Sequence, residues 1–581
     1  MEKDQKQYQP PKEFTPALKE ALTGSDIQNF LDRIAIAGGA YIDPEGLPDR
    51  RISTNCEALS EVDRFVKNDV IKPEMTHAGM ETFDHPMGVL GIYPGSDPTL
   101  DPVLLLSHYD SVPNGGRYDG KVGVALSVKV VEAMKKQGIK PTRSIAVLAL
   151  TGEESAGFNQ ALFGSRAMFQ GLTESELASH RIGGATIGSK LDADELEKVR
   201  KPWLGPQGMF LQHIKAAIEP HADLDGSIIQ DGKELGVYTG IAAPDRRIIS
   251  IGNTPLVAEQ ENGNEQFAKL VVHGKTGHSG NTPMGKDHRV DGLVITSDLI
   301  LGLPKLTQMF EDAGIHAGIS IGDIHVEGQA MNKIPGTTEM QVRLTQEDQW
   351  QGEKALEVLA KWIELKNTSL KAIYPHEDTL VTLEQLDQAS AKDFYDPDAM
   401  QKRLRACAAV IKTTNEVGEA FSNQDNRATI STIHMQNGII ELGADRRGIS
   451  AQARKEMIDQ ISQRIDAITD ASVSMSPPLP GSNNPVTLDP SLTSVLEQTA
   501  STYGISLKKM FSPGGHDIMN VSDVGIPSAM LVVPSRSRKD LGLAFDPNSG
   551  MGHNPDEYST PEDLEKGAQV LYASVLELVN Q

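Results

Sequence analysis

The sequence predicts an α/β protein with a mixed, mostly parallel sheet that carries helices on both faces, interrupted by an inserted α+β domain. Segments 103–106 and 145–150 are apolar at every position, and Ser144 precedes the second, a pattern typical of strands buried on both faces of a sheet. Between them, residues 122–137 have the apolar spacing of a helix, and Gly138 follows as a helix terminator. Strand, helix and strand in this order predict a βαβ unit with parallel strands.

Further elements are predicted upstream of this βαβ unit. The stretch from Phe14 to Lys72 is mainly helical in pattern, and Ser25-Asp26 can cap a helix over Ile27–Ile36. Short strands are expected at Met80–Phe83 and Val89–Tyr93. These elements extend the same sheet and cover it.

The middle of the chain has a different pattern. Lys269–His273 alternates like a half-exposed strand, Gly292–Leu303 has the spacing of an amphipathic helix, and Ile319–Val326 predicts another strand. A strand is expected again at Gly438–Ala444, followed by a long helix from about Ala451 to Ile468. Together these elements predict a small antiparallel α+β domain.

Proline and glycine mark the exit from this middle domain. Pro477–Gly481 predicts a linker, after which a buried strand is expected at Ser528–Val533. We therefore expect a discontinuous catalytic domain at residues 1–245 and 480–581. A lid or dimerisation domain would be inserted at residues 246–479, and it would contain an extra insertion at about residues 345–435.

Composition limits the classes of function. A chain of 581 residues is too long for one ordinary core. Its net charge of −24 disfavours nucleic acid and anionic membranes as partners, because both require a basic surface. The two cysteines form no CxxC pair, the N-terminus is polar, and no apolar run approaches the roughly 18 residues of a spanning helix. A soluble cytoplasmic protein is expected.

Metal-ligating side chains follow the two buried strands. His108 ends the first strand, and Asp110 can hold the His108 ring from behind. Asp119 precedes the helix, and Glu153 and Glu154 follow the second strand. Open α/β sheets place their ligands at this edge, and imidazole with carboxylate suits zinc and its neighbours. The alternatives are a helix cap for Asp119 and a solvated acidic turn for the glutamates.

An ordered series of motifs resembles the amidohydrolase branch of the aminoacylase and zinc-carboxypeptidase superfamily. Within that branch the similarity is to N-carbamoyl-L-amino-acid hydrolase, allantoate amidohydrolase and β-ureidopropionase. It covers roughly residues 30–345 and 435–580. The motifs lie at 107–120, 153–154, 164–166, 236–241, 278–284, 332–336, 514–517 and 552–557.

The resemblance implies two divalent ions per subunit (Zn, Mn or Co) bridged by a carboxylate and a water molecule. Carried over to this chain, Asp119 bridges the ions, with His108 on one of them and Glu154 on the other. His553 resembles the C-terminal histidine ligand. Glu153 resembles the base that deprotonates the bridging water.

Two histidines compete for the fifth ligand position. In the family, this histidine follows a glutamate by two residues and precedes a Gly-Val-Val-Thr-Gly-Ile stretch by fifteen. His221 fits both relations, through Glu219 and Gly236, whereas His213 fits neither and is expected to lie in a helix. The chain departs from the family at Leu224, where the relatives carry a substrate-contacting glutamine.

The resemblance also implies substrate-binding residues. His278 resembles the lid-domain histidine that reaches across a dimer to the substrate oxygen, Asn332 the substrate-binding asparagine, and His516 a pocket-lining residue. The carboxylate-binding arginine is either Arg343 or Arg447. We favour Arg447, which follows Gly438 by the family's interval of nine residues and has the planar fork that binds a carboxylate bidentately.

These expectations together predict a homodimeric, metal-dependent hydrolase. It would cleave the C–N amide bond of an N-carbamoyl, ureido or related N-acyl amino acid with a metal-activated water. One alternative is a dipeptidase or aminoacylase of the same superfamily. Another, from a different class, is a non-catalytic binding protein on the same scaffold.

Overall fold

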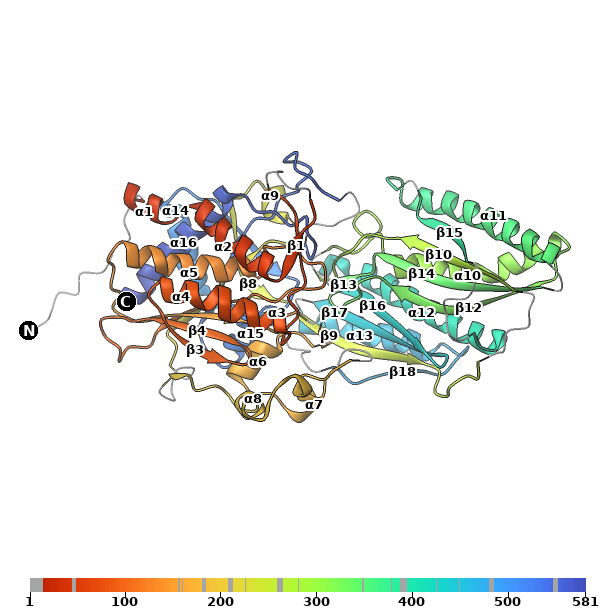
Figure 1. The fold of residues 1–581 in the computed structure, drawn as a ribbon, viewed down its shortest axis with the longest axis horizontal. Helices are drawn as coiled ribbons and strands as arrows, with labels where there is room; N and C mark the ends of the chain where they lie inside the picture. The colour runs from red at the N-terminus through yellow and green to blue at the C-terminus, as the bar shows by residue number, and fades with distance from the viewer. Residues whose placement is uncertain are drawn as a thin grey trace, which may run out of the picture. The chain divides into compact units, whose positions relative to one another are not determined.

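The chain folds into two compact units, which Figure 1 shows in a computed structural model. Unit 1 comprises Met1–Ala243 and Asn483–Gln581, and unit 2 comprises Pro244–Ser482. The expected polar N-terminus at residues 1–7 and the end of the linker at Pro480-Gly481 lie outside the described residues. The described residues are 14–43, 49–154, 157–158, 160–179, 184–206, 213–224, 226–258, 265–280, 282–346, 349–377, 379–386, 394–424, 426–448, 450–479, 485–546 and 552–581.

Unit 1 is built on a nine-stranded mixed sheet with the order β19-β8-β21-β7-β5-β6-β4-β3, and β20 pairs with β8. The central strands β21, β7, β5 and β6 run parallel, while β4 and β3 at one side and β8 at the other pair antiparallel. The strands are β3 (Glu81–His85), β4 (Gly88–Tyr93), β5 (Val103–His108), β6 (Ile145–Leu150), β7 (Ala216–Ala222), β8 (Leu235–Ile241), β19 (Val486–Thr487), β20 (Leu507–Ser512) and β21 (Ser528–Val533).

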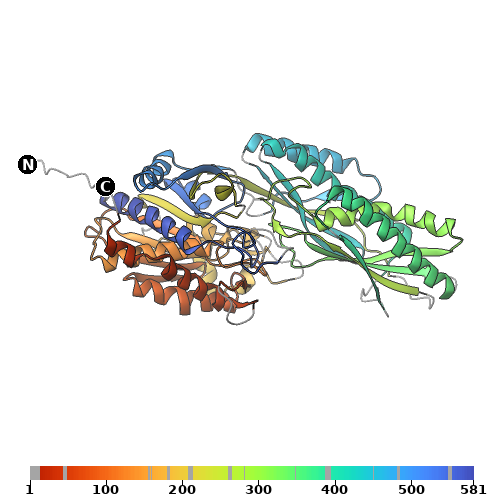
Figure 2. The same ribbon diagram turned by 90° about the horizontal axis from the view of Figure 1, so that it is seen from above.

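Helices cover both faces of this sheet, as the apolar strands predict. Val103 and Leu105 of β5 point into one core, and Leu104 and Leu106 point into the other. The first core is closed by α2 (Gly24–Ala37), α5 (Lys121–Lys136), α14 (Pro490–Thr502) and α16 (Pro561–Asn580). Figure 2 shows the blue α16 against the orange α5. The second core is closed by α6 (Phe163–Phe169) and α15 (Ile518–Asp523).

The remaining elements of unit 1 are short. Helix α2 begins earlier than the sequence predicts, since Thr23 rather than Ser25-Asp26 caps it by accepting from the backbone N–H of Asp26 at 3.2 Å. The other elements are α1 (Pro16–Ala21), β1 (Gly39–Tyr41), β2 (Ile52–Thr54), α3 (Glu61–Phe65), the π-helix Val66–Ile71, α4 (Lys72–His77), α7 (Glu174–Leu177), the 3₁₀ turn Gly188–Lys190, α8 (Ala193–Val199) and α9 (Ser227–Gln230).

Unit 2 contains two four-stranded sheets, with the orders β12-β14-β10-β15 and β16-β17-β9-β18. A small pair, β11 (Gly277–His278) with β13 (Lys333–Ile334), lies beside them. The strands are β9 (Ala243–Ile251), β10 (Glu265–His273), β12 (Ala317–Val326), β14 (Thr337–Gln346), β15 (Val381–Leu386), β16 (Arg427–Gln436), β17 (Ile439–Gly448) and β18 (Val473–Met475). The helices are α10 (Gly292–Asp312), α11 (Gln349–Ile373), α12 (Pro397–Ala420), α13 (Ala451–Asp466) and the 3₁₀ turn Ser422–Gln424.

Helix α10 is the one described helix that is long and apolar enough to cross a membrane, with a mean hydropathy of 1.2. Half of that stretch is buried inside the fold, and Leu293, Leu299 and Leu306 belong to the core of unit 2. It is therefore a core helix. The cysteines, Cys56 and Cys407, are both free and buried.

Candidate metal centre

The parallel strands bring the predicted ligands to one edge of the sheet. β7, β5 and β6 are neighbours, and His108 lies opposite Leu150 across the β5–β6 pairing. His221 comes near the end of β7, and the Glu153-Glu154 pair follows β6 directly. Since parallel strands end at the same edge, side chains distant in sequence meet there.

Two groups of ligand atoms share Asp119. Its Oδ1 lies 3.4 Å from Nε2 of His221 and 3.9 Å from Nε2 of His108. Its Oδ2 lies 2.9 Å from Nε2 of His553, which is 3.5 Å from Oε1 of Glu154. In each group the ligand atoms lie within 4.8 Å of one another, and all five residues are buried. The arrangement offers one carboxylate oxygen to each of two sites.

The donor atoms fit a cation. Nε2 of His108 and Nε2 of His221 are buried and have no hydrogen-bond partner in the described part of the chain, a costly state for polar atoms unless an ion satisfies them. Nδ1 of His221 lies 2.9 Å from the carbonyl oxygen of Ala222. This contact assigns the proton to Nδ1 and leaves the Nε2 lone pair for a metal.

The structure rejects the alternative roles for the acidic residues. Gly120, not Asp119, caps α5, and no side chain makes the cap. The carboxylates of Glu153 and Glu154 are 12% and 3% exposed, so the pair is not a solvated turn. Asp110 holds this turn, because its carboxylate accepts the backbone N–H groups of Glu153 at 3.4 Å and Glu154 at 3.1 Å.

Asp110 and Glu153 take up different positions around His108. Oδ1 of Asp110 lies 3.4 Å from Nδ1 of His108, behind the ring, and Oε2 of Glu153 lies 3.9 Å from Nε2, in front of it. Burial raises the pKa of the Glu153 carboxyl well above its usual range, and repulsion from Glu154 adds to the shift, while His108 opposes it. A raised pKa is what a general base near neutral pH requires.

Glu557 is part of the site, although the sequence assigned it no role. Its Oε2 accepts the backbone N–H groups of Tyr118 and Asp119, both at 3.2 Å, and its Oε1 accepts the N–H of His553 at 2.6 Å. Burial raises the pKa of Glu557 to about 7, with repulsion from Asp119 contributing. The Glu557 carboxylate thus fixes both the loop that carries Asp119 and the turn at His553, a residue whose φ is 60°. The sequence feature that could have pointed to Glu557 is its position at the end of the 552–557 motif.

His516 extends the same cluster. Its ring centroid is 4.6 Å from that of His221, and its Nε2 lies 2.7 Å from the Ser512 hydroxyl. Glu219, His221 and His516 form a third group of possible ligands. This group uses His221 again, so it is continuous with the first group.

His213 does not lie in a helix as predicted. It precedes β7 in an irregular segment, 53% of its side chain is exposed, and its Nδ1 is 3.8 Å from Asp101. This position is at the start of the strand, whereas His221 is near its end, at the edge where the other ligands meet. The family departure, Leu224, is buried against Gly552, where a β-carbon would come within 2.8 Å of it.

The predicted substrate residues of unit 2 form a group of their own. His278 pairs with Lys333 across β11 and β13, and the backbone N–H of Ser279 donates to the carbonyl of Asn332 at 2.9 Å. The Ser279 hydroxyl donates to Asp445 at 2.6 Å, and Nε of Arg447 donates to the same oxygen at 3.0 Å. Unit 2 therefore brings the backbone segments of His278 and Asn332 side by side, and Asp445 links the residue after His278 to Arg447.

Arg343, the competing arginine, belongs to a different neighbourhood. It lies on β14, with Nη1 3.5 Å from Oε1 of Glu265 and its guanidinium 4.7 Å from the centre of the Phe394 ring. On β14 it pairs with Phe267 and Ser320, whereas Asn332 lies just before β13. This placement favours Arg447 as the carboxylate-binding arginine.

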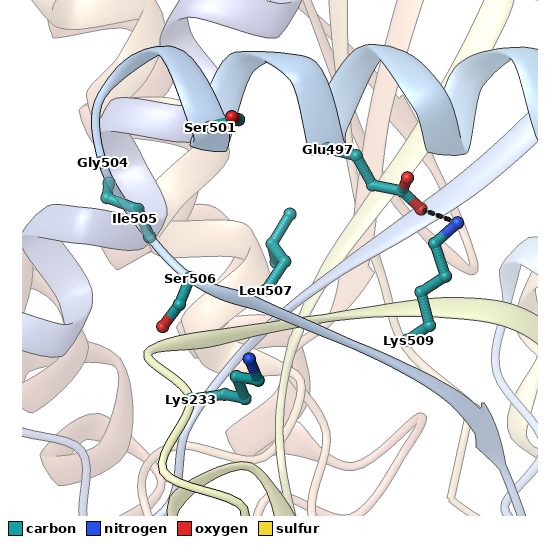
Figure 3. Close-up of a pocket in the computed structure, with 8 residues that line it drawn as sticks. All are labelled: Lys233, Glu497, Ser501, Gly504, Ile505, Ser506, Leu507 and Lys509. Carbon is teal, nitrogen blue, oxygen red and sulfur yellow. Dashed lines mark ion pairs between the residues drawn. The ribbon is translucent and has the colours of Figure 1, made fainter.

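A separate surface cavity of about 390 Å³ lies beside α14 and β20 in unit 1 (Figure 3). It is lined by Gly504, Ser506 and Lys509, among others, and Lys509 forms an ion pair with Glu497 at 2.8 Å. None of the predicted site residues lines it.

Comparison with known proteins agrees with the fold. The chain resembles the crystal structure of an amidase of the hydantoinase/carbamoylase family from Burkholderia vietnamiensis, with a TM-score of 0.53 and 18% identity over 97% of this chain and 99% of that one. A second such amidase, from Burkholderia multivorans, has a TM-score of 0.50 and 20% identity over 97% and 99% of the two chains. The expected α/β architecture is confirmed.

Sequence relatives carry related names. The N-carbamoyl-L-amino acid amidohydrolase of Geobacillus stearothermophilus is 29% identical over 278 residues, which cover 47% of this chain and 59% of the relative. The allantoate amidohydrolase of Bacillus subtilis is 22% identical over 503 residues, 86% and 87% of the two chains. The ureidoglycolate hydrolase of Oryza sativa is 25% identical over 322 residues, which cover 52% of this chain and 60% of the relative. The chain thus aligns with about three fifths of the Geobacillus and Oryza relatives.

The comparisons confirm the superfamily that the motifs resemble. The model of the peptidase family M20/M25/M40 matches residues 104–577, which include His108 at the end of β5, both proposed ligand groups and all of unit 2. The chain belongs to the peptidase family M20/M25/M40.

Proposed function

We propose that this chain hydrolyses the C–N amide bond of an N-carbamoyl, ureido or related N-acyl amino acid. The observation that carries the proposal is Asp119, whose two oxygens face two separate sets of buried ligands, His108 with His221 and Glu154 with His553. The names of the Geobacillus and Bacillus relatives support a ureido-type substrate.

Two divalent cations would occupy these groups, with Asp119 between them. Imidazole and carboxylate donors accept Zn, Mn and Co alike, so the ligand set does not select one of them. When bound, such ions polarise a carbonyl and lower the pKa of a water molecule. A cation would also oppose the upward shift in the pKa of Glu153.

The residues of the chain then have distinct tasks. Glu153 takes the proton of the attacking water and returns it to the leaving nitrogen. Asp110 fixes the His108 ring and the turn of Glu153. His278 would stabilise the developing oxyanion, an interaction worth about 3 kcal/mol for a well-placed donor. Asn332 and Arg447 would orient the substrate carboxylate.

The first experiment is a substrate panel with the Glu153→Gln variant as its control. We expect wild-type protein reconstituted with Zn, Mn or Co to release ammonia from N-carbamoyl amino acids, while Glu153→Gln keeps its metal and loses at least about a thousandfold in turnover. Metal content is measured by elemental analysis. Near-normal turnover of Glu153→Gln would refute its role as the base.

A dipeptidase or aminoacylase of the same family is the second candidate. It is favoured by Leu224, which is buried beside Gly552 where the ureido-cleaving relatives are expected to place a glutamine. The panel therefore includes dipeptides and N-acetyl amino acids. Amine release without ammonia would select this candidate.

We also propose a cytoplasmic location. Cys56 and Cys407 are free and buried, and a chain without disulfides suits a reducing compartment. Fractionation of the native host, with the chain detected by antibody, tests this proposal.

A further inference from the structure

Unit 2 contains two modules with the same topology. Module A consists of β10, α10, β12, β14, α11 and β15, and module B of β9, α12, β16, β17, α13 and β18. Each runs strand, helix, strand, strand, helix, strand, and when the strands of each are numbered in chain order, both sheets have the order 2-3-1-4. Module A is inserted between the first strand and the first helix of module B.

The two modules meet through equivalent elements. The first helices α10 and α12 pack together, and the second strands β12 and β16, each at the end of its sheet, lie side by side. Lys412 of α12 forms an ion pair with Asp298 of α10 at 2.8 Å, and one apolar core includes Leu299 and Cys407 from the two helices. Equivalent surfaces facing each other are the layout of a two-fold dimer interface, here within one chain.

The predicted substrate residues are divided between the modules. Module A carries His278 in the loop after its first strand, and Asn332 in the loop between its second and third strands. At the second position, module B has only the tight turn Asn437-Gly438, with φ of 50° and 73°. After its first strand, where module A carries His278, module B has the whole of module A inserted. Arg447 lies on the third strand of module B.

A buried cluster of polar side chains joins module A to module B. Asp445 of module B accepts from Ser279 of module A at 2.6 Å and from Arg447 at 3.0 Å, on the same oxygen. Arg289 of module A donates to the Ser279 carbonyl and to the Thr429 hydroxyl of module B, both at 2.6 Å. All five residues are at least nine-tenths buried.

The cluster has the charge to receive an anion. The hydrogen bonds described for Arg289 all go to neutral oxygens, namely carbonyls of module A and the Thr429 hydroxyl. Asp445 also faces a second arginine, Arg246, at 3.6 Å. A substrate carboxylate would therefore meet guanidinium groups from both modules.

We infer that this junction is a substrate-carboxylate site assembled within a single chain, with Asp445 as the positioning residue that holds Arg447 beside the His278 loop. The inference rests on the proposed function and deepens it, because it assigns both halves of the carboxylate site to one chain and gives Asp445 the task of positioning Arg447. It also makes a second copy of the chain unnecessary for joining His278 and Asn332 to Arg447. The homodimer predicted from the resemblance stays a prediction, and it would form through surfaces other than this junction.

The first test compares Asp445→Asn with wild type. We expect KM for an N-carbamoyl amino acid to rise at least about tenfold, because the neutral carboxamide removes the negative charge that strengthens the hydrogen bond from Arg447, with a smaller loss in kcat and unchanged metal content. For the same substrate with its carboxylate converted to an amide, the two proteins should have equal KM. A purely structural role would raise both KM values equally and would overturn the inference.

Two further variants guard against misfolding. Ser279→Ala removes only one of the two hydrogen bonds and should give an intermediate KM. Asp298→Asn is the matched control, since it breaks another ion pair between the modules and should leave KM unchanged. An equal rise for Asp298→Asn would assign the effect to general loosening of the junction and overturn the role of Asp445.

Binding measured without turnover separates the inference from the proposed function. Calorimetric titration of the Glu153→Gln protein with an N-carbamoyl amino acid should give a Kd at least about tenfold lower than that of the Glu153→Gln/Asp445→Asn protein. Equal Kd values would overturn the inference even if the enzyme is active. The expected difference in Kd without any turnover by wild type would instead reject the proposed reaction.

The single-chain origin is tested by complementation. His278→Ala and Arg447→Ala chains with different tags are co-expressed and purified together. We expect activity no higher than that of the two variants alone, because each chain has a damaged junction of its own. Recovery of roughly half of wild-type activity in the doubly tagged heterodimer would show that the halves come from two chains and would overturn the inference.

Discussion

At the scale of single residues, the chemistry depends on which atom of each side chain faces the centre. Asp119 is shared because its carboxylate turns one oxygen to His221 and the other to His553. The orientation follows from backbone contacts made elsewhere, since Glu557 fixes the main chain at Asp119 and at His553. A carboxylate whose own position is fixed loses little entropy when an ion binds.

The two competing histidines make the first prediction at this scale. We expect His221→Ala to lower the metal content, because its Nε2 faces Asp119, and His213→Ala to leave it at the wild-type level, because His213 is half-exposed at the opposite end of β7. Elemental analysis after dialysis reads out both variants. The reverse result would exchange the assignments.

Asp63 makes a prediction about pH. It is buried at the start of α3, and burial raises its pKa to about 7 from 3.8. The unfolded chain therefore releases this proton near pH 4 and the folded chain only near pH 7, so this group's contribution to stability is complete below pH 4 and is lost as the pH rises to 7. The loss would be on the order of 4 kcal/mol.

The test of this prediction is Asp63→Asn, which mimics the protonated acid. Urea denaturation at pH 5 and at pH 8 should show a smaller fall in the free energy of unfolding for the variant than for wild type. An unchanged difference between the two pH values would show that Asp63 ionises in the folded protein as it does in a peptide.

At the scale of elements, the site depends on how closely α5 approaches β5. Gly120 caps α5 with a φ of 61°, and a β-carbon there would overlap the His108 imidazole. The helix can start directly against the ligand only because this position has no side chain. The backbone of the turn thus delivers Asp119 and His108 to the same point.

Two glycines near opposite ends of α5 provide a matched pair of variants. Gly120→Ala should lose metal and activity almost completely, because the new methyl group displaces His108. Gly138→Ala has a similar φ of 65° but meets nothing within 4 Å, so it should lose about 1 kcal/mol of stability and keep its metal. Elemental analysis and thermal unfolding separate the two effects, and equal metal loss in both variants would contradict this account.

At the scale of the whole molecule, the two units should differ in how much a bound metal ion stabilises them. All five proposed ligands and the proposed base belong to unit 1. Without a cation, the carboxylates of Asp119, Glu153 and Glu154 would lie buried beside one another, with Asp110 and Glu219 close by. A bound ion therefore stabilises unit 1 in particular.

Removal of metal should act on one unit only. Treatment with a chelator should lower the thermal midpoint of unit 1, and an ion at about a hundredfold excess over its Kd should restore about 3 kcal/mol. Hydrogen exchange measured by mass spectrometry is expected to show faster exchange in β5, β6 and β7 and no change in the strands of unit 2. An equal change in unit 2 would contradict the confinement of the ligands to unit 1.

The sequence by itself determined the elements around the metal centre. Continuous apolar runs specified β5 and β6 as strands buried on both faces, with His108 at the end of the first and Glu153-Glu154 just after the second, whereas the resemblance implied the ligand roles of Asp119 and Glu154. These features are local, because burial on both faces leaves its trace in a few consecutive residues. The choice of His221 over His213 came from the resemblance, because only His221 has the family's interval to Gly236.

Only the tertiary structure decided the relations between distant segments. It showed that residues 345–435, expected to be an insertion, supply α11 and β15 to one module and α12 to the other. It also showed the contacts of Glu557 with the segments of Asp119 and His553, and it placed Arg447 beside Asp445 and Arg343 beside Glu265. Strand order and hydrogen bonds to the backbone depend on partners far along the chain, and local periodicity records that a residue is buried without recording what it is buried against.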